Sequence, residues 1–274
     1  MHGKVCVVTG ATGGIGAATA RGLAELGATV LLVARDATRG GALREEIART
    51  TGNERVHLFR ADLSAQAQVR AVAAEIAAAH PRVDVLVNNA GVYSFRRQES
   101  VDGIELTWAV NHLAPFLLTR LLMEPLRAAG GARVIAVSSQ AHRLAKIPWQ
   151  DMQMRRYFGL RAYNVTKLAN ILFTRELARR SEGSGITANA LHPGVVATEI
   201  LMSGFPPIRL FRRYLRTHEQ GASTPIFLAS SPRAQGITGR YWIDERPVDP
   251  SPAALDDDAA RRLWEWSEEM TGAR

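Results

Sequence analysis

The hydrophobic positions of this chain follow two alternating patterns. Short, continuous apolar runs are typical of strands buried on both faces of a parallel sheet, and stretches of helical periodicity separate these runs. Gly27 and Pro81 stand where two of the helical stretches should end. In chain order the expected strands and helices of this first part are strand 4–9, helix 15–26, strand 29–34, helix 41–49, strand 55–60, helix 65–79 and strand 83–87.

The same alternation continues to the end of the sequence, and no repeat or linker interrupts it. Alternating strands and helices predict a parallel sheet with helices on both faces. We therefore expect one doubly wound α/β domain, residues 1–274, with about seven parallel strands. The later elements are expected as helix 104–128, strand 133–137, helix 162–180, strand 186–191, helix 219–230, strand 240–243 and an amphipathic C-terminal helix near 256–270, with prolines 247, 250 and 252 breaking the chain before it.

The composition narrows the possible classes of protein. Hydrophobic residues make up 46% of the chain and charged residues 22%, as in a globular domain. One cysteine, Cys6, rules out an intramolecular disulfide, and the seven scattered histidines form no zinc motif, so no metal site is expected. No apolar run is long enough to span a bilayer, and the first strand begins at Lys4, so we expect neither a transmembrane segment nor a signal peptide. These features predict a cytoplasmic protein.

The net charge of +8 admits nucleic acid, an acidic membrane or a phosphorylated small molecule as a partner. The sequence contains no nucleic-acid-binding motif and no long basic arm, so nucleic acid is not expected. A basic surface-binding protein is one alternative that remains open, and a cluster of positive charge away from the ligand cleft would favour it.

A glycine-rich turn follows the first strand, with Gly10, Gly14 and Gly16 at its key positions. Glycine permits a tight turn and a close approach of backbone amides to a pyrophosphate, and the next helix directs its free N–H groups at that anion. The alternative is a tight turn without a ligand. A strand before the turn and a helix after it favour a dinucleotide site.

The second strand ends in Arg35 and Asp36, at the point that faces the adenosine ribose in dinucleotide-binding folds. An acidic residue here binds the 2′-hydroxyl of NAD, and an arginine accommodates the 2′-phosphate of NADP. Arg35 comes first at the strand exit, and Arg39 is a second candidate partner for the phosphate. The sequence therefore favours NADP(H) over NAD(H), with a solvated surface arginine as the alternative for Arg35.

Several blocks in a fixed order resemble the short-chain dehydrogenases/reductases. The blocks are 9–16, 88–91, 110–112, 138–139, 163–167 and 192–194, and they cover the chain from residue 4 to about 243. The stretches 34–40, 110–119, 167–177 and 260–264 look closest to the retinol-dehydrogenase-like and carbonyl-reductase-like members. Membrane-anchored relatives carry an apolar N-terminal segment that this sequence lacks, so the resemblance does not imply a retinoid substrate.

Tyr163 and Lys167 are four positions apart on an expected helix, so they share one face. The resemblance implies that Tyr163 is the general acid/base, and a nearby ammonium favours the phenolate and lowers its pKa. It also implies that Ser139 holds the substrate oxygen and that Asn111 supports a proton-relay water. Ser138 is expected to point away, because neighbours on a strand alternate.

The resemblance further assigns the cofactor contacts. Beside Tyr163 and Lys167, the expected cofactor-binding residues are Gly10, Thr12, Gly14, Ile15, Gly16, Arg35, Arg39, Asp62, Leu63, Asn89, Ala90, Gly91, Pro193, Val196 and Thr198.

Two segments lie outside the family's shared blocks. The stretch 140–162 is long, with apolar residues that shape a substrate pocket or form a packed surface excursion; it also leaves open whether the chain is a homodimer or a monomer. His142 within it is expected to be structural. The segment 204–216 carries four arginines and an amphipathic pattern, and we expect a substrate lid near 199–220. The same pattern suits contact with an anionic membrane or a plain surface helix.

Together these features predict an NADP(H)-dependent oxidoreductase that interconverts a carbonyl and an alcohol on a small to medium, apolar substrate. The alternative from another class is a dinucleotide-binding regulator or scaffold without turnover.

Overall fold

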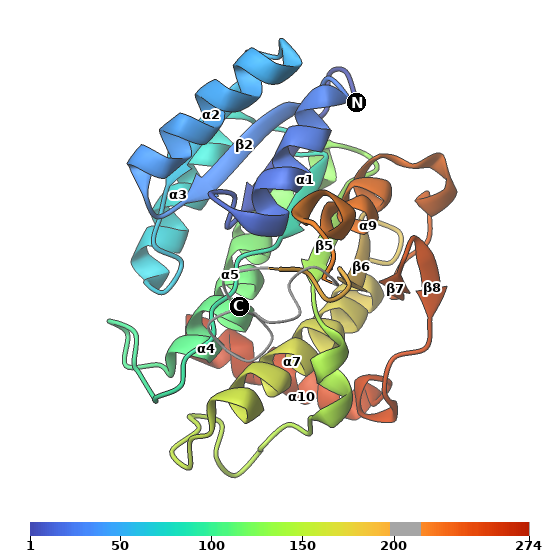
Figure 1. The fold of residues 1–274 in the computed structure, drawn as a ribbon. Helices are drawn as coiled ribbons and strands as arrows, with labels where there is room; N and C mark the ends of the chain where they lie inside the picture. Colours follow the sequence, from blue (N-terminus) through green and yellow to red (C-terminus); the bar gives the residue numbers. More distant parts are fainter. Residues whose placement is uncertain (198–214, 274) are drawn as a thin grey trace.

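The structure, a computed structural model, describes residues 1–197 and 215–273. Within these residues one eight-stranded sheet runs through the molecule in the order β3-β2-β1-β4-β5-β6-β7-β8, with helices on both faces (Figure 1). The strands β1 to β7 are parallel to their neighbours, and β8 is antiparallel to β7. The predicted doubly wound α/β fold is confirmed.

The strands are β1 (Val5–Thr9), β2 (Thr29–Ala34), β3 (Val56–Arg60), β4 (Val85–Asn88), β5 (Arg133–Val137), β6 (Thr187–His192), β7 (Tyr241–Ile243) and β8 (Arg246–Val248). The longer helices are α1 (Gly14–Glu25), α2 (Ala37–Thr51), α3 (Gln66–Ala79), α5 (Ala114–Leu121), α6 (Met123–Ala128), α7 (Gly159–Arg180), α9 (His218–Ser230) and α10 (Asp257–Thr271). The short helical segments are α4 (Leu106–Trp108), η1 (Ala109–Leu113), η2 (Gln140–Leu144), η4 (Pro232–Ala234) and η5 (Pro252–Ala254).

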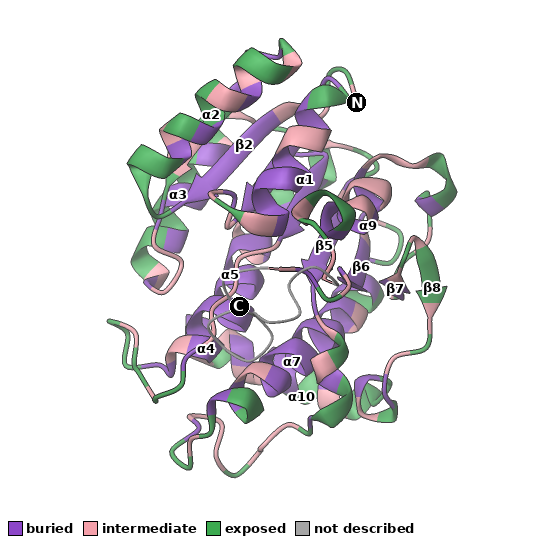
Figure 2. Cartoon of the chain, in the orientation of Figure 1, coloured by how far each residue is buried: buried purple, intermediate pink, exposed green. Residues whose placement is uncertain are grey.

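Neighbouring residues on a strand feed two separate hydrophobic layers. Val8 and Leu32 pack with α1, α2 and α9 on one face of the sheet, whereas Val7 and Leu31 pack with α3, α5 and α7 on the other. Figure 2 shows the buried residues concentrated in the strands and on the sheet-facing sides of these helices. This is why the strands read as continuous apolar runs rather than as alternating ones.

The helix expected over 104–128 is wrong as one continuous element. The structure divides it into α4, a π-helical turn η1, α5 and α6. Pro115 lies at the start of α5 and Pro125 in the first turn of α6. Because proline has no N–H to donate, each one suits the start of a helix and disfavours its interior.

The strand count of about seven misses β8. Pro247 lies in this strand, so the expectation that this proline breaks the chain is wrong. The strand is the last of the sheet and pairs only with β7, and an edge strand tolerates proline because one of its sides needs no ladder hydrogen bond.

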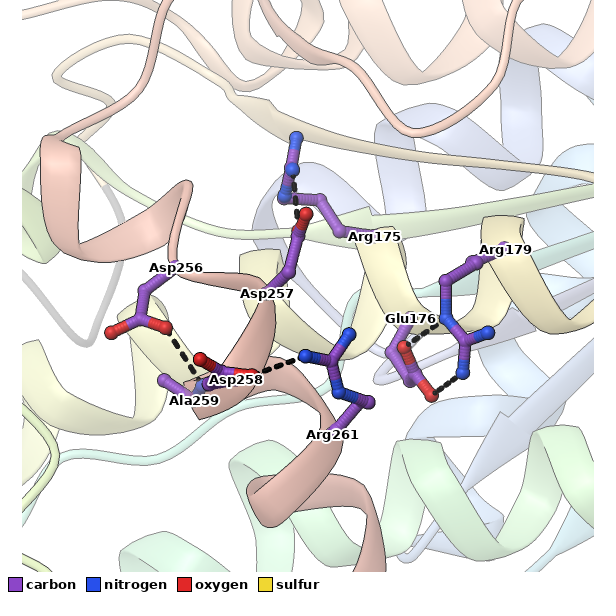
Figure 3. Close-up of polar contacts among 8 residues, drawn as sticks. All are labelled: Arg175, Glu176, Arg179, Asp256, Asp257, Asp258, Ala259 and Arg261. Atoms are coloured by element: carbon purple, nitrogen blue, oxygen red, sulfur yellow. Dashed lines mark hydrogen bonds and ion pairs between the residues drawn. The ribbon is translucent and has the colours of Figure 1, made fainter.

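The C-terminal helix α10, expected over 256–270, packs along α7. Its Trp264 is buried against Phe116 of α5 and Phe173 of α7, with ring centroids 4.9 and 6.0 Å away. Figure 3 shows the polar contacts at one end of this interface, where Arg175 of α7 pairs with Asp257 at 2.7 Å. The helix thus covers the outer face of α7.

Candidate functional site

A cavity of about 1480 Å³ lies at the carboxyl ends of the parallel strands. This is where open parallel sheets bind ligands, since the loops after the strands converge there. Every predicted cofactor-binding residue that the structure describes lines this cavity, in the loops after β1, β2, β3, β4 and β6, at the starts of α1 and α2, and on α7. Thr198 and the segment 199–214 of the expected lid lie outside the described residues.

The glycine turn after β1 has no space for larger residues. Gly10 and Gly14 have φ values of 64° and 55°, a region that glycine adopts without strain. A Cβ on Gly16 would lie 2.3 Å from the carbonyl oxygen of Gly10, and one on Gly10 would lie 2.8 Å from the Cα of Ala90. A side chain at either position would therefore force the turn to move.

The helix α1 begins at this turn, and its N-cap Gly13 offers no side-chain acceptor to the first N–H groups. Those groups therefore suit an anion from the cavity, with the positive end of the helix dipole behind them. The turn has the donors and the room that a pyrophosphate requires.

Arg35 and Arg39 line the end of the cavity beside the glycine turn. The carboxylate of Asp36 accepts a hydrogen bond from the Arg39 backbone N–H at 3.0 Å and caps α2. The Arg39 guanidinium reaches the carbonyl oxygen of Thr12 at 3.4 Å. Asp36 thus caps α2 and also lines the cavity, together with the two arginines.

Two predicted contact residues also hold the loops in place. The Asn89 side chain donates to the carbonyl oxygens of Thr9 and Gly10, at 2.9 and 3.2 Å. The Asp62 carboxylate accepts from both the backbone and the hydroxyl of Ser64. Both residues therefore shape the cavity wall through the backbone of its loops.

The far end of the cavity brings together Ser139 from the loop after β5 and Tyr163 and Lys167 from α7. Lys167 Nζ lies 5.5 Å from the centroid of the Tyr163 ring and donates to the carbonyl oxygen of Val137 at 2.8 Å. The hydroxyl of Ser138 donates to the Lys167 carbonyl oxygen at 2.7 Å and so ties β5 to α7. Both serines follow the end of β5 and both line the cavity, with the Ser138 hydroxyl engaged by α7 and the Ser139 hydroxyl at the N-cap of η2.

The protonation of this group is set by burial. Burial raises the pKa of Tyr163 to about 12, and a hydrogen bond with Ser139 opposes that rise. Burial also lowers the pKa of Lys167 to about 8. The pKa of Tyr163 is therefore raised and not lowered as expected, because burial disfavours the charged phenolate.

Asn111 does not line the cavity with the other three predicted catalytic residues. It is fully buried in the π-helical turn η1, where its Oδ1 accepts from Val92 N at 2.7 Å. Its amide donates to Val92 O and to the hydroxyl of Thr166, at 3.0 and 3.1 Å. The side chain joins the loop after β4 to α7, one residue before Lys167.

Most of the apolar wall around Tyr163 is formed by residues that the sequence did not lead us to expect. Tyr93 lies edge-on to Tyr163 with a centroid distance of 6.1 Å, and four aliphatic side chains extend the wall. These are Leu106, Val110, Leu160 and Val195. Tyr93 lies two positions after the 88–91 block, and Leu106 and Val110 have helical spacing, so both signals were present in the sequence.

His192 and His218 also line the cavity and were not predicted as site residues. Burial lowers the pKa of His192 to about 4, so this ring is neutral near pH 7. His192 begins the block 192–194, and that position was its signal.

The aromatic and methionine residues of the stretch 140–162 do not line the cavity. Trp149, Met152 and Tyr157 pack against the core beside α7, and Met154 is buried. The stretch is therefore a packed excursion, and its contribution to the cavity wall comes from Gln140, Ala141 and Leu160.

Within the described residues we find neither a membrane-spanning helix nor a metal-binding cluster. Residues 1–197 and 215–273 contain no helix that is long and apolar enough to cross a membrane. The same part of the chain holds no group of three or more His, Cys, Asp or Glu side chains arranged for a metal ion.

Comparison with protein families gives one match, to a model described as short chain dehydrogenase, over residues 4–207. Human retinol dehydrogenase 12 is 42% identical over 278 residues, which are 100% of this chain and 88% of that protein. Mouse retinol dehydrogenase 14 is 39% identical over 290 residues, which are 99% of this chain and 87% of that protein.

Solved structures with the same fold are also similar to this chain. An uncharacterized protein from Mycobacterium Paratuberculosis has a TM-score of 0.81 and 34% identity, covering 99% of this chain and 94% of its own. L-Sorbose reductase from Gluconobacter frateurii, complexed with NADPH and L-sorbose, has a TM-score of 0.73 and 27% identity, covering 92% of this chain and 97% of its own.

Proposed function

The chain belongs to the short chain dehydrogenase family, and from this premise we propose that it interconverts a carbonyl compound and an alcohol with NADP(H). One observation carries the proposal. Ser139, Tyr163 and Lys167 line the same cavity as the glycine turn, so one elongated ligand in it would reach both.

The glycine turn and the N-terminus of α1 would hold the pyrophosphate, as their geometry fits an anion. Arg35 and Arg39 would hold the 2′-phosphate that distinguishes NADP(H) from NAD(H), because guanidinium groups pair well with phosphate. When bound, the reduced nicotinamide supplies a hydride to the carbonyl carbon. The complex of L-sorbose reductase with NADPH supports this choice of cofactor.

Tyr163 would donate the proton that the carbonyl oxygen needs during reduction. Its high pKa keeps it a phenol near neutral pH, which suits an acid. Ser139 would donate a hydrogen bond to the same oxygen, and the ammonium of Lys167 would stabilise the phenolate left behind. In the direction of alcohol oxidation the same groups act in reverse.

The substrate is expected to be an apolar alcohol or its carbonyl partner. The wall beside Tyr163 is formed by Tyr93, Val110 and Leu160 together with other apolar side chains. Relatives that carry the name retinol dehydrogenase support an apolar substrate class. A lid over 199–220, contact of that segment with a membrane, a cytoplasmic location and the choice between monomer and homodimer stay predictions.

The test is a panel of aldehydes, ketones and alcohols of graded size, retinol included, assayed with NADPH/NADP and NADH/NAD by nicotinamide absorbance. We expect turnover with NADP(H), loss of turnover in Tyr163→Phe, and nearly unchanged NADPH binding in that variant. Tyr157→Phe is the matched control, since this tyrosine bonds to Ser94 and does not line the cavity.

Normal turnover in Tyr163→Phe would overturn the assignment of the acid. Tight NADPH binding without turnover on any member of the panel would instead favour the regulator or scaffold.

A further inference from the structure

Two histidines from different elements bind the same peptide unit, the one that joins Ser139 to Gln140. Nδ1 of His142 lies 2.6 Å from the carbonyl oxygen of Ser139. On the other side of the peptide, the backbone N–H of Gln140 donates to Nδ1 of His192 at 3.4 Å. Both rings are buried, and they come from η2 and from the end of β6.

We propose that His142 and His192 are positioning residues, which together hold the Ser139–Gln140 peptide and through it the Ser139 hydroxyl. The kinetic part of this inference rests on the proposed function. The structural part does not, because it concerns a fixed peptide and two fixed rings.

The partners determine the tautomer of each ring. A carbonyl oxygen only accepts, so Nδ1 of His142 carries a proton. A backbone N–H only donates, and Ser251 donates one to Nε2 of His142 at 3.0 Å, so this nitrogen carries none. By the same argument, Nδ1 of His192 carries no proton. His142 is therefore the Nδ1–H tautomer and His192 the Nε2–H tautomer, and both are neutral.

The two histidines and the Ser139–Gln140 peptide that they bind form what we call the clamp. It matters for Ser139 because the hydroxyl of this serine is held by a hydrogen bond close to that peptide. Ser139 is the N-cap of η2, and its Oγ accepts from the backbone N–H of Ala141 at 3.2 Å. This bond uses a lone pair and leaves the hydroxyl proton available to a group in the cavity. A shift of the Ser139–Gln140 peptide would move Oγ relative to Tyr163.

The surroundings keep both rings neutral near pH 7. Burial lowers the pKa of His142 and of His192, the latter to about 4. Arg143 faces His142, and Arg216, paired with Asp244, faces His192. Tyr241 of β7 packs edge-on against His142 at 4.9 Å. Protonation of either ring in acid would remove the acceptor for Ser251 or for Gln140.

The first test needs no turnover. Ring ¹⁵N chemical shifts of the labelled protein report the tautomer of each histidine, and the seven histidines are assigned from single variants. We expect an Nδ1–H signal for His142 and an Nε2–H signal for His192 at pH 8, the latter unchanged down to pH 6. Slow hydrogen exchange of the Gln140 amide in the wild type and fast exchange in His192→Leu are expected alongside. The opposite tautomer at either ring, or equal exchange in both proteins, would overturn the clamp even if no substrate is found.

The second test uses matched variants of His192. Asparagine places an acceptor near the position of Nδ1 but does not titrate, and leucine has a similar size but no acceptor. We expect His192→Leu to lower kcat about 10- to 100-fold, because a small misplacement of a reacting group costs that much. His192→Asn should recover most of kcat and lose the acid limb of the wild-type pH profile. Circular dichroism checks that each variant is folded.

A folded leucine variant with wild-type kcat would overturn the positioning role. So would an asparagine variant as slow as the leucine variant, because a structural role of the ring alone would then explain both.

Discussion

The ammonium nitrogen of Lys167 lies 5.5 Å from the centroid of the Tyr163 ring, and its hydrogen bond goes to the backbone of Val137. The lysine therefore ties α7 to the end of β5 and lies over the Tyr163 ring. As long as Lys167 is protonated, it places a positive charge in the buried site beside Tyr163.

We expect the rate of carbonyl reduction to fall as the pH rises through about 8, where the buried Lys167 loses its proton. Tyr163, with a pKa near 12, stays a phenol through that range and does not cause the fall. The measurement is the pH dependence of kcat with saturating NADPH. In Lys167→Arg, which retains its charge, this limb should vanish; a wild-type rate that stays constant through pH 8 and beyond would contradict the prediction.

Arg35→Ala should weaken the binding of NADPH much more than that of NADH. A charged hydrogen bond contributes about 1.5–3 kcal/mol, which is about one to two decades in Kd. Titration calorimetry with both cofactors measures the difference. Arg44→Ala, on α2 and outside the cavity lining, removes the same charge and should alter neither affinity. Equal weakening of both cofactors by Arg35→Ala would reject a phosphate contact.

Gly16→Ala should abolish cofactor binding and lower the free energy of unfolding by about 1–3 kcal/mol, as overpacking does. The added Cβ would lie 2.3 Å from Gly10 O and 2.4 Å from the Asn89 amide, so the turn must move. Gly41→Ala on α2 meets nothing within 4 Å and should stabilise by about 0.4–1 kcal/mol. Denaturant unfolding measures the free energy of unfolding, and a titration measures the affinity for NADPH. Intact NADPH binding in Gly16→Ala would contradict the prediction, because the turn would then accommodate the added methyl group.

The protein should lose stability in mild acid, and His112 should account for part of the loss. Burial lowers the pKa of His112 from 6.5 to about 3, so between these values the unfolded chain binds a proton that the folded chain does not. Its contribution falls by up to about 1.4 kcal/mol per pH unit as the pH drops below 6.5. His192 adds to the same slope down to about pH 4.

Urea unfolding from pH 7 to pH 4 measures this slope. His112→Gln should flatten it by about one proton, while His57→Gln, on an exposed position of β3, is the control. Equal slopes in wild type and His112→Gln would show that the buried ring is protonated in the folded state.

The sequence predicts those features of the fold and the site that depend on residues close together in the chain. The glycine turn, the apolar strands and the Tyr163–Lys167 spacing each depend on a few neighbouring residues, and the structure brings them to one end of the sheet.

Other features depend on contacts between distant segments. The tautomers of His142 and His192 follow from Ser251 and Gln140, partners that no spacing reveals. The π-helical turn around Asn111 depends on Val92 and Thr166, and the high pKa of Tyr163 reflects its burial. The sequence predicts a chain break at Pro247, because the place of β8 at the edge of the sheet is a tertiary property.

The packing of α10 on α7 has a consequence for synthesis on the ribosome. Helix α7 carries Tyr163 and Lys167, and the partner that covers its outer face is not translated until residue 271. A nascent chain therefore exposes Phe173 and the rest of that apolar face for the whole time that residues 181–256 are being made. During this interval the face is free to bind a chaperone or another nascent chain, and the helix that carries Tyr163 gains its full support only when α10 has emerged.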